Sequence, residues 1–148
     1  MAFTEVTGDL FDLGLPAIGH GCNCAGAMGA GIAREFKRRF PKMYREYWRR
    51  CQVGRFELGD IFVWEADDVV VYNLATQRLP RPPAILDAID TSVRAALGDA
   101  EHRRLNRLGL PRIGAGLGGI AWSDVASVLK EATDASPVEL VVVSLPGP

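Results

Sequence analysis

Two glycine-rich segments contain the residue types in this chain that are best suited to bind a ligand. The first covers residues 19–33 and the second covers residues 111–122, and each stands between an apolar run and a predicted helix. Glycine allows the backbone to approach a ligand closely and to adopt a positive φ. The helix N-terminus that follows offers unpaired N–H groups and a partial positive charge. Two anion-binding segments of this kind predict a ligand that carries two phosphates.

The second segment admits two other interpretations, which its context excludes. Gly114, Gly116 and Gly119 have the spacing of the dinucleotide-binding fingerprint. That fingerprint opens a longer doubly wound sheet, whereas only about one strand follows the predicted helix here. The segment also lacks the Gly-Lys-Ser or Gly-Lys-Thr sequence that nucleoside triphosphate hydrolysis of the Walker type requires. Phosphate binding by the backbone remains, because it requires only local geometry.

Four polar side chains near these segments are candidates for ligand contacts or catalysis. Asn23 lies in the first segment, where its amide can both donate to and accept from sugar hydroxyls. Asp9 follows the first predicted strand and can accept from an exocyclic amine, or serve as a turn residue. Gln77 follows another predicted strand, at the sheet edge where ligands bind in open α/β folds. His20 precedes the glycines and would titrate near neutrality, or would be a core histidine.

Alternating soft side chains in the first segment raise the question of a metal site. His20, Cys22 and Cys24 would share one face of a strand, and with Cys51 they could supply four zinc ligands. Structural zinc sites use Cys-x-x-Cys pairs, and the sequence has none. We therefore expect buried, unreactive cysteines and no metal. Three cysteines, an odd number, also fit a reducing compartment, so we expect a cytoplasmic protein.

Length and composition predict one soluble globular domain that covers residues 1–148. A chain of this length can bury a substantial core, and 48% of its residues are hydrophobic. The net charge of −1 argues against duplex nucleic acid as the main partner. We interpret the basic run at residues 34–50 as the solvated face of a helix. No apolar stretch has membrane-spanning length, and the N-terminus lacks the features of a signal peptide.

Hydrophobic periodicity and turn residues predict the elements that position the two segments. Strands are predicted at residues 3–7, 16–22, 60–65, 69–75, 105–113 and 138–145, with a hairpin turn at 66–68. Helices are predicted at residues 29–40, 41–51, 85–101 and 122–132, with a proline-rich loop at 79–83. This order predicts an α/β fold, a three-layer α/β/α sandwich in which helices cover both faces of a central mixed sheet.

The glycine segments and their neighbours resemble those of macrodomains, the ADP-ribose-binding modules. The most specific similarities are residues 28–33 with Phe36 and Pro41, and residues 111–119 with Trp122. Within the superfamily the chain most resembles the branch that contains the terminal ADP-ribose protein glycohydrolase and the bacterial enzymes that remove ADP-ribose from DNA. The resemblance extends over nearly the whole chain, which implies a single macrodomain with a three-layer fold and no cofactor.

The resemblance also implies a role for each part of the site. Asp9 would bind the adenine amine, Asn23 and residues 26–32 would hold the distal ribose, and residues 114–120 would wrap the pyrophosphate. The implied ligand-binding residues are Asp9, Leu10, Asn23, Gly26, Met28, Gly29, Gly31, Ile32, Thr76, Gly114, Ala115, Gly116, Leu117, Gly118, Gly119, Ile120 and Leu145. The implied partners are ADP-ribose and ADP-ribosylated proteins, with no membrane. An ADP-ribosylated nucleic acid is the less favoured acceptor, and we expect a monomer.

Two positions depart from the pattern of the related enzymes. The glycohydrolases of this branch use a lysine where this chain has Gln77, and the protein-directed enzyme has an aspartate where this chain has Gly118. A lysine amine can form a Schiff base, which a glutamine amide does not do well. We therefore expect hydrolysis of ADP-ribose that is ester-linked to glutamate or aspartate. Asn23 and Gln77 would orient water or ribose hydroxyls, and N–H groups of the loops would stabilise developing charge.

Two alternatives to this activity remain open. A reader that binds ADP-ribose without turnover is favoured by the missing lysine and loop aspartate. Residues 20–26 also resemble the corresponding loop of the yeast-type ADP-ribose 1″-phosphate phosphatases. That second resemblance implies a catalytic role for His20 as an acid or base.

Overall fold

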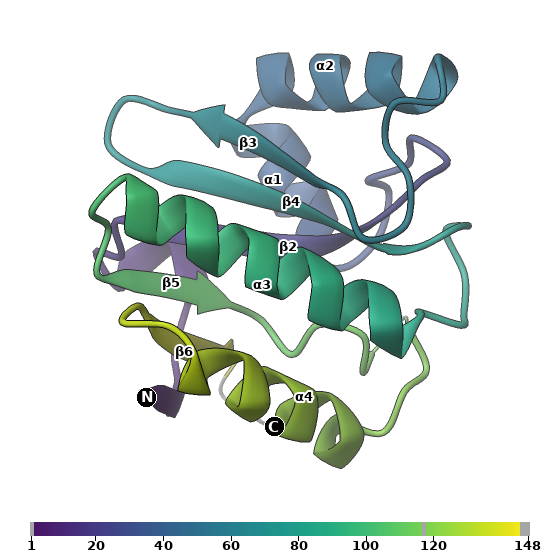
Figure 1. Ribbon diagram of the computed structural model, residues 1–148. Coiled ribbons are helices and arrows are strands. Elements are labelled where there is room, and N and C mark those ends of the chain that lie inside the picture. Colours follow the sequence, from purple (N-terminus) through teal and green to yellow (C-terminus); the bar gives the residue numbers. More distant parts are fainter. Residues whose placement is uncertain (1, 117, 146–148) are drawn as a thin grey trace.

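The chain folds in layers around one six-stranded sheet (Figure 1). The computed structural model describes residues 2–116 and 118–145. The strands are β1 (Phe3–Thr7), β2 (Ala17–Asn23), β3 (Ile61–Glu65), β4 (Val70–Gln77), β5 (Arg107–Leu110) and β6 (Glu139–Ser144). The helices are η1 (Leu10–Asp12, a short 3-10 helix), α1 (Ile32–Arg39), α2 (Pro41–Gln52), α3 (Leu86–His102) and α4 (Trp122–Asp134). The strand order is β1-β6-β5-β2-β4-β3, and the pairings are parallel apart from the antiparallel pair β3–β4.

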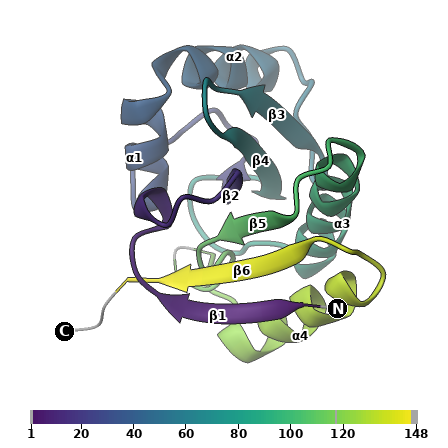
Figure 2. The same cartoon turned by 90° about the vertical axis from the view of Figure 1, so that its left-hand side faces the viewer.

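Helices cover both faces of the sheet. Figure 2 shows α1 and α2 on one side and α3 and α4 on the other. On the α3–α4 side the core is built mainly from aliphatic side chains, such as the fully buried Ile89, Val93 and Leu129. On the α1–α2 side the core is more aromatic and contains Phe36 and Tyr47. The predicted three-layer α/β/α sandwich with a mixed sheet is confirmed.

The predicted elements differ from the observed ones mainly where they border the glycine segments. α1 begins at Ile32 rather than at residue 29, because its N-cap residue Gly31 has a φ of +59°, which is outside the helical range. β5 is shorter than predicted at both ends. At its carboxyl end the strand stops before Pro111, which has no N–H group to donate to the ladder. Both differences leave the central parts of the two glycine segments, residues 24–31, 111–116 and 118–121, outside helices and strands.

The hairpin of β3 and β4 is confirmed. The backbone N–H of Ala66 donates to the carbonyl of Val69 at 3.0 Å. β4 continues two residues further than predicted, because its pairing with β2 extends, after an irregularity beyond Cys22, to Asn23 and Gln77. Gln77 therefore belongs to the end of the strand. Among the helices that the structure describes, none is long and apolar enough to cross a membrane.

Candidate functional site

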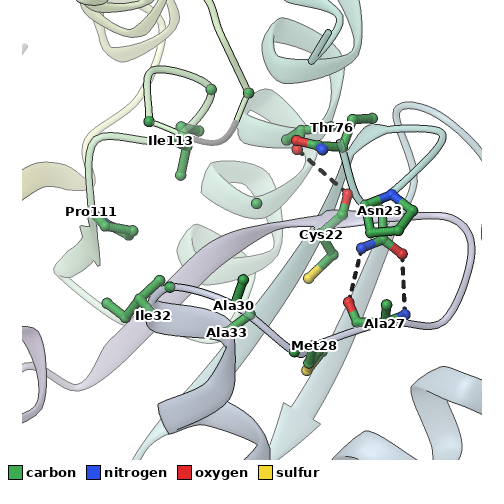
Figure 3. Close-up of a pocket in the computed structure, with 18 of the residues that line it drawn as sticks. Cys22, Asn23, Ala27, Met28, Ala30, Ile32, Ala33, Thr76, Pro111 and Ile113 are labelled. Atoms are coloured by element: carbon green, nitrogen blue, oxygen red, sulfur yellow. Dashed lines mark hydrogen bonds between the residues drawn. The ribbon is translucent and has the colours of Figure 1, made fainter. Parts of the chain in front are cut away.

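The carboxyl ends of the central parallel strands border a cavity of about 290 Å³, the first cavity (Figure 3). Ligands bind at this edge in open α/β sheets. Strands β2 and β4 contribute residues from their ends, and both glycine segments contribute backbone. The lining residues are Gly21, Cys22, Asn23, Ala27, Met28, Gly29, Ala30, Gly31, Ile32, Ala33, Thr76, Gln77, Pro80, Pro111, Arg112, Ile113, Gly114, Gly116 and Gly118. The two glycine segments that stand out in the sequence thus face the same cavity.

Asn23 organises the first glycine segment. Its Oδ1 accepts from the backbone N–H groups of Ala25 at 3.0 Å and Ala27 at 3.2 Å, and its Nδ2 donates to the carbonyl of Ala27 at 2.8 Å. Figure 3 shows both bonds to Ala27. The hydroxyl of Tyr47, on α2, lies 3.0 Å from Asn23 Oδ1 and 2.7 Å from the Asn23 carbonyl oxygen. An amide nitrogen carries two N–H groups, so Asn23 has the donor capacity for a ligand in the cavity that it lines as well as for Ala27.

The second glycine segment turns sharply, because two of its glycines have φ values that other residues rarely adopt. The φ is +76° at Gly114 and +75° at Gly119. The N–H of Ile120 donates to the carbonyl of Gly114 at 2.9 Å and closes the loop. Gly118 packs against the same turn, and a Cβ at this position would lie 2.5 Å from the Gly114 oxygen and 2.7 Å from its Cα. Any larger residue at Gly118 would therefore displace the loop.

Gln77 supports the rim of the first cavity. Its Nε2 donates to the carbonyls of Leu79 at 2.9 Å and Arg81 at 3.2 Å. Both N–H groups of the amide are therefore engaged by the proline-rich loop at residues 79–83. Pro80 from this loop lines the cavity. Gln77 thus holds one wall of the cavity in place.

A second cavity of about 590 Å³ adjoins the first. The residues that line both are Gly31, Ile32, Pro111 and Arg112. The other residues that line the second cavity are Gly8, Asp9, Leu10, Phe11, Glu35, Arg39, Val143, Ser144 and Leu145. The two cavities therefore lie next to one another, separated by residues from both glycine segments.

Asp9 lies at the edge of the second cavity and is exposed. Its Oδ1 accepts from the backbone N–H of Phe11 at 2.9 Å and caps the 3-10 helix. Asp9 therefore serves as a turn residue, which was one of its two expected roles. A carboxylate has further acceptor positions, which leaves Asp9 able to accept from a ligand as well. The Arg39 guanidinium lies 4.3 Å from the centre of the Phe11 ring, so a cation and an aromatic ring meet at the same edge.

His20 lies in the core and does not line either cavity. Its ring is 0% exposed and stacks on Phe36 with 3.8 Å between the ring centres. His20 Nε2 donates to Asn73 Oδ1 at 2.8 Å, and the Asn73 amide donates to the carbonyl of Phe62 at 3.1 Å. Burial lowers the pKa of His20 to about 4, although the bond to Asn73 acts in the opposite direction. The ring is therefore a neutral core group, and its placement disfavours the catalytic role that the sequence suggested.

The cysteines are free thiols. Burial raises the pKa of Cys22 well above its usual value and raises the pKa of Cys24 to about 11. Both thiols are therefore protonated and weakly nucleophilic near neutral pH. Within residues 2–116 and 118–145, no group of three His, Cys, Asp or Glu side chains is arranged to hold a metal ion.

Comparison with known proteins identifies the family. The family model described as Macro domain matches residues 20–129. The chain belongs to the Macro domain family. This macrodomain is 31% identical over 134 residues to the DNA ADP-ribosyl glycohydrolase of Thermus aquaticus, over 88% of this chain and 37% of that protein. It is 28% identical over 144 residues to the ADP-ribose 1″-phosphate phosphatase of Candida albicans, over 85% of this chain and 90% of that protein.

Solved structures show the same architecture. The macrodomain of Mycobacterium tuberculosis DarG has a TM-score of 0.88 and 31% identity to this chain, over 98% of both chains. The DNA ADP-ribosyl glycohydrolases are longer proteins, of which this chain spans 37% to 39%. The similarity to them is therefore a similarity to one part of each protein.

Most residues that the resemblance assigned to ligand binding line the two cavities of this macrodomain. The first cavity contains Asn23, Met28, Gly29, Gly31, Ile32, Thr76, Gly114, Gly116 and Gly118 from that set, and the second contains Asp9, Leu10 and Leu145, with Gly31 and Ile32 shared. The described members of the set that do not line either cavity are Gly26, Ala115, Gly119 and Ile120. Leu117 lies outside the described residues.

Sequence reasoning missed two arginines at the cavities. Arg112 lines both, and its guanidinium lies 5.2 Å from the centre of the Trp122 ring. Arg39 lines the second cavity, although the sequence interpretation placed it on a solvated helix face. A usable signal was helical spacing, because Ile32, Glu35 and Arg39 are three and four residues apart and line the same cavity.

Proposed function

We propose that this macrodomain is an ADP-ribosyl hydrolase, which binds ADP-ribose along its two joined cavities and releases it from an acceptor. The observation that carries the proposal is the shared wall between the cavities, with a glycine segment on each side. The second cavity, with Asp9 at its edge, suits the adenosine end of the ligand. The first cavity, with Asn23, suits the distal ribose. Arg112 lies at the shared wall, where a guanidinium can bind the pyrophosphate.

The substrate linkage that we propose is an ester between C1″ and a glutamate or aspartate side chain. Water supplies the new oxygen at C1″, the carboxylate leaves with the electrons of the broken bond, and one proton passes to solvent. A carboxylate is a good leaving group, so a positioned water and stabilised charge are sufficient. No lysine is required, which is consistent with Gln77 at the end of β4.

Asn23 and Gln77 act as positioning residues in this proposal. Asn23 fixes the backbone of Ala25 and Ala27 and retains one N–H group for ribose or water. Gln77 fixes the loop that brings Pro80 to the cavity. Backbone N–H groups of the glycine segments would stabilise negative charge on the ligand.

Release of free ADP-ribose from a glutamate-modified protein tests the proposed activity. We also expect ADP-ribose to bind in the micromolar range, on the order of −8 kcal/mol, when titrated by calorimetry. AMP should bind far more weakly, because it leaves the first cavity empty. Equal affinity for AMP and ADP-ribose would contradict the two-cavity assignment. Tight binding of ADP-ribose without release from any acceptor would make the domain a reader, and release of phosphate from ADP-ribose 1″-phosphate would make it a phosphatase.

Nucleic acid is a second candidate acceptor, and two observations favour it. Relatives at 31% identity are named DNA ADP-ribosyl glycohydrolases. The chain also concentrates basic residues within 32–55, next to the first glycine segment. The same cavities would hold the ADP-ribosyl group, and the nucleic acid would lie outside them. Parallel assays with an ADP-ribosylated oligonucleotide and an ADP-ribosylated protein separate the two acceptors.

A further inference from the structure

The charge of this protein is distributed unevenly. Residues 32–55, which form α1, α2 and the turn after them, contain nine basic and two acidic side chains, a net charge of +7. Since the whole chain carries −1, all other residues together carry −8. The chain is therefore near neutral in total but strongly basic on its α1–α2 side, and this side is suited to bind nucleic acid despite the net charge of −1.

Much of this basic charge has no acidic partner. Glu35 pairs with Arg38 and Arg39, and Glu46 pairs with Arg49 and Arg50. Among the residues that the structure describes, the basic side chains of 32–55 without a carboxylate within 4.0 Å are Arg34, Lys37, Lys42, Arg45 and Arg55, and all five residues are exposed. Uncompensated exposed cations at this density provide an attractive surface for a polyanion.

An exposed tryptophan stands among these cations. Trp48 is 48% exposed, whereas the other aromatic rings of the α1–α2 core are buried or partly buried. Arg45, Trp48 and Arg49 are three and four residues apart on α2, so they share one face of the helix. Arg49 and Arg55 also line a surface hollow of about 480 Å³, together with Arg50, Val53 and Glu46, the ion-pair partner of Arg49. We call these four residues, Arg45, Trp48, Arg49 and Arg55, the α2 basic face.

The α2 basic face lies next to the first glycine segment, which forms one wall of the first cavity. A Cβ at Gly26 would lie 3.1 Å from Trp48 Cδ1, so the indole packs against the first glycine segment. The next residue, Ala27, lines the first cavity. α2 also holds this segment through Tyr47, which lies within hydrogen-bond distance of Asn23. An acceptor that leaves the first cavity past Ala27 would therefore lie near Trp48.

We propose that the α2 basic face docks the nucleic-acid strand that carries the ADP-ribosyl group. Trp48 would stack on a base, and Arg45, Arg49 and Arg55 would contact phosphates. The inference rests on the second candidate acceptor of the proposed function. An acidic peptide would satisfy the arginines but would leave the indole without a planar partner, whereas every base offers a face for stacking.

Binding of a short labelled single-stranded DNA, followed by fluorescence anisotropy at several salt concentrations, tests the proposal. Trp48→Ala should weaken binding about tenfold or more, because a base loses its stacking partner. The slope of log affinity against log salt is negative. Arg45→Glu and Arg49→Glu should each reduce its magnitude by about 0.7, the value for one lost phosphate contact on a single strand. Arg49→Lys, which keeps the charge, should restore most of the slope.

Arg94→Glu is the matched control. Arg94 lies on α3, across the sheet, and pairs with Asp90 in the same helix much as Arg49 pairs with Glu46. DNA binding by this variant should equal that of the wild type. Unchanged DNA affinity in Trp48→Ala and Arg49→Glu would overturn the proposal, as would tighter binding of polyglutamate than of DNA at the same face.

Calorimetry with ADP-ribose separates a docking defect from a folding defect or a failure of the proposed function. Variants of the α2 basic face should keep the ADP-ribose affinity of the wild type, since none of their side chains lines the first or second cavity. If Trp48→Ala loses both affinities, Trp48→Tyr replaces it, and this variant should keep DNA binding because it retains an aromatic ring. Absence of ADP-ribose binding by the wild type would instead refute the proposed function. The DNA-binding measurements would still test the α2 basic face independently.

Discussion

Replacing Asn23 with alanine tests how the site is held together. The substitution removes the acceptor that pairs with two backbone N–H groups, at Ala25 and Ala27, and the donor that pairs with the carbonyl of Ala27. Tyr47 loses one partner but keeps the Asn23 carbonyl at 2.7 Å. Three hydrogen bonds without replacement, at about 1 kcal/mol each, amount to about 3 kcal/mol. Since 1.36 kcal/mol is a factor of ten, release of ADP-ribose should slow by about 10²-fold.

The assay measures release of ADP-ribose from a glutamate-modified protein, together with ADP-ribose affinity by calorimetry. If Asn23 acts by holding the first glycine segment, affinity and release should fall together. Gln77→Ala is the comparison, because Gln77 also lines the first cavity but makes its two bonds in an exposed position. We expect about fivefold slower release for this variant, equivalent to about 1 kcal/mol.

Two results would refute this reasoning. Unchanged release and affinity in Asn23→Ala would show that the first segment holds its shape without the amide. A larger loss in Gln77→Ala than in Asn23→Ala would show that the glutamine acts on the reacting atoms and does more than support the loop at residues 79–83. Circular dichroism of both variants confirms that the comparison is made on folded protein.

Three further predictions concern the second glycine segment and the core. Gly118→Ala should reduce ADP-ribose affinity at least tenfold in calorimetry, because its Cβ would meet backbone atoms of Gly114, whereas Gly116→Ala should reduce it much less, since among the described residues other than its chain neighbours no atom lies within 4 Å of a Cβ there. Gly116→Glu should abolish binding in a protein that remains folded, because it places a carboxylate where the ligand carries phosphate; retained binding would show that the segment does not cradle phosphate. The pKa of His20 drops from 6.5 to about 4 on folding, so the unfolded chain binds more protons between these values, and stability that is complete above pH 6.5 should fall by about 3 kcal/mol toward pH 4. Urea unfolding at pH 7 and pH 4.5 measures this loss of stability. His20→Gln keeps a donor for Asn73 and should remove most of the pH dependence. If the stability of this variant still follows the wild-type pH dependence, other groups cause the loss.

The order of strands and helices was predictable because it depends on local patterns. Ile89, Val93 and Leu97 recur at helical spacing and are buried in α3 as expected. The ends of elements were less predictable, since the start of α1 depends on the φ of Gly31, which a sequence does not reveal. The two glycine segments were recognisable for the same local reason, because glycine density is a property of the chain itself.

The roles of individual polar side chains could not be predicted, because their partners are distant in sequence. Asn23 meets Tyr47 across 24 positions, and His20 meets Asn73 across 53. The alternation of His20 with its neighbours predicts that they share a face of β2, but does not say which helix covers that face. The packing of Phe36 on the His20 ring shows that His20 is a core residue rather than a residue of the site. That contact exists only in the folded chain.

The common wall of the two cavities has a kinetic consequence. If ADP-ribose occupies both cavities, every contact described there is with the part of the substrate that remains after the acceptor has left. Contacts with the adenosine and the pyrophosphate bind substrate and product almost equally, so they lower KM without accelerating the chemical step, unlike the groups around Asn23 that would position ribose or water. Free ADP-ribose should then be a competitive inhibitor with an inhibition constant close to KM. Dissociation of ADP-ribose from the protein should limit turnover when the ADP-ribosylated substrate is abundant.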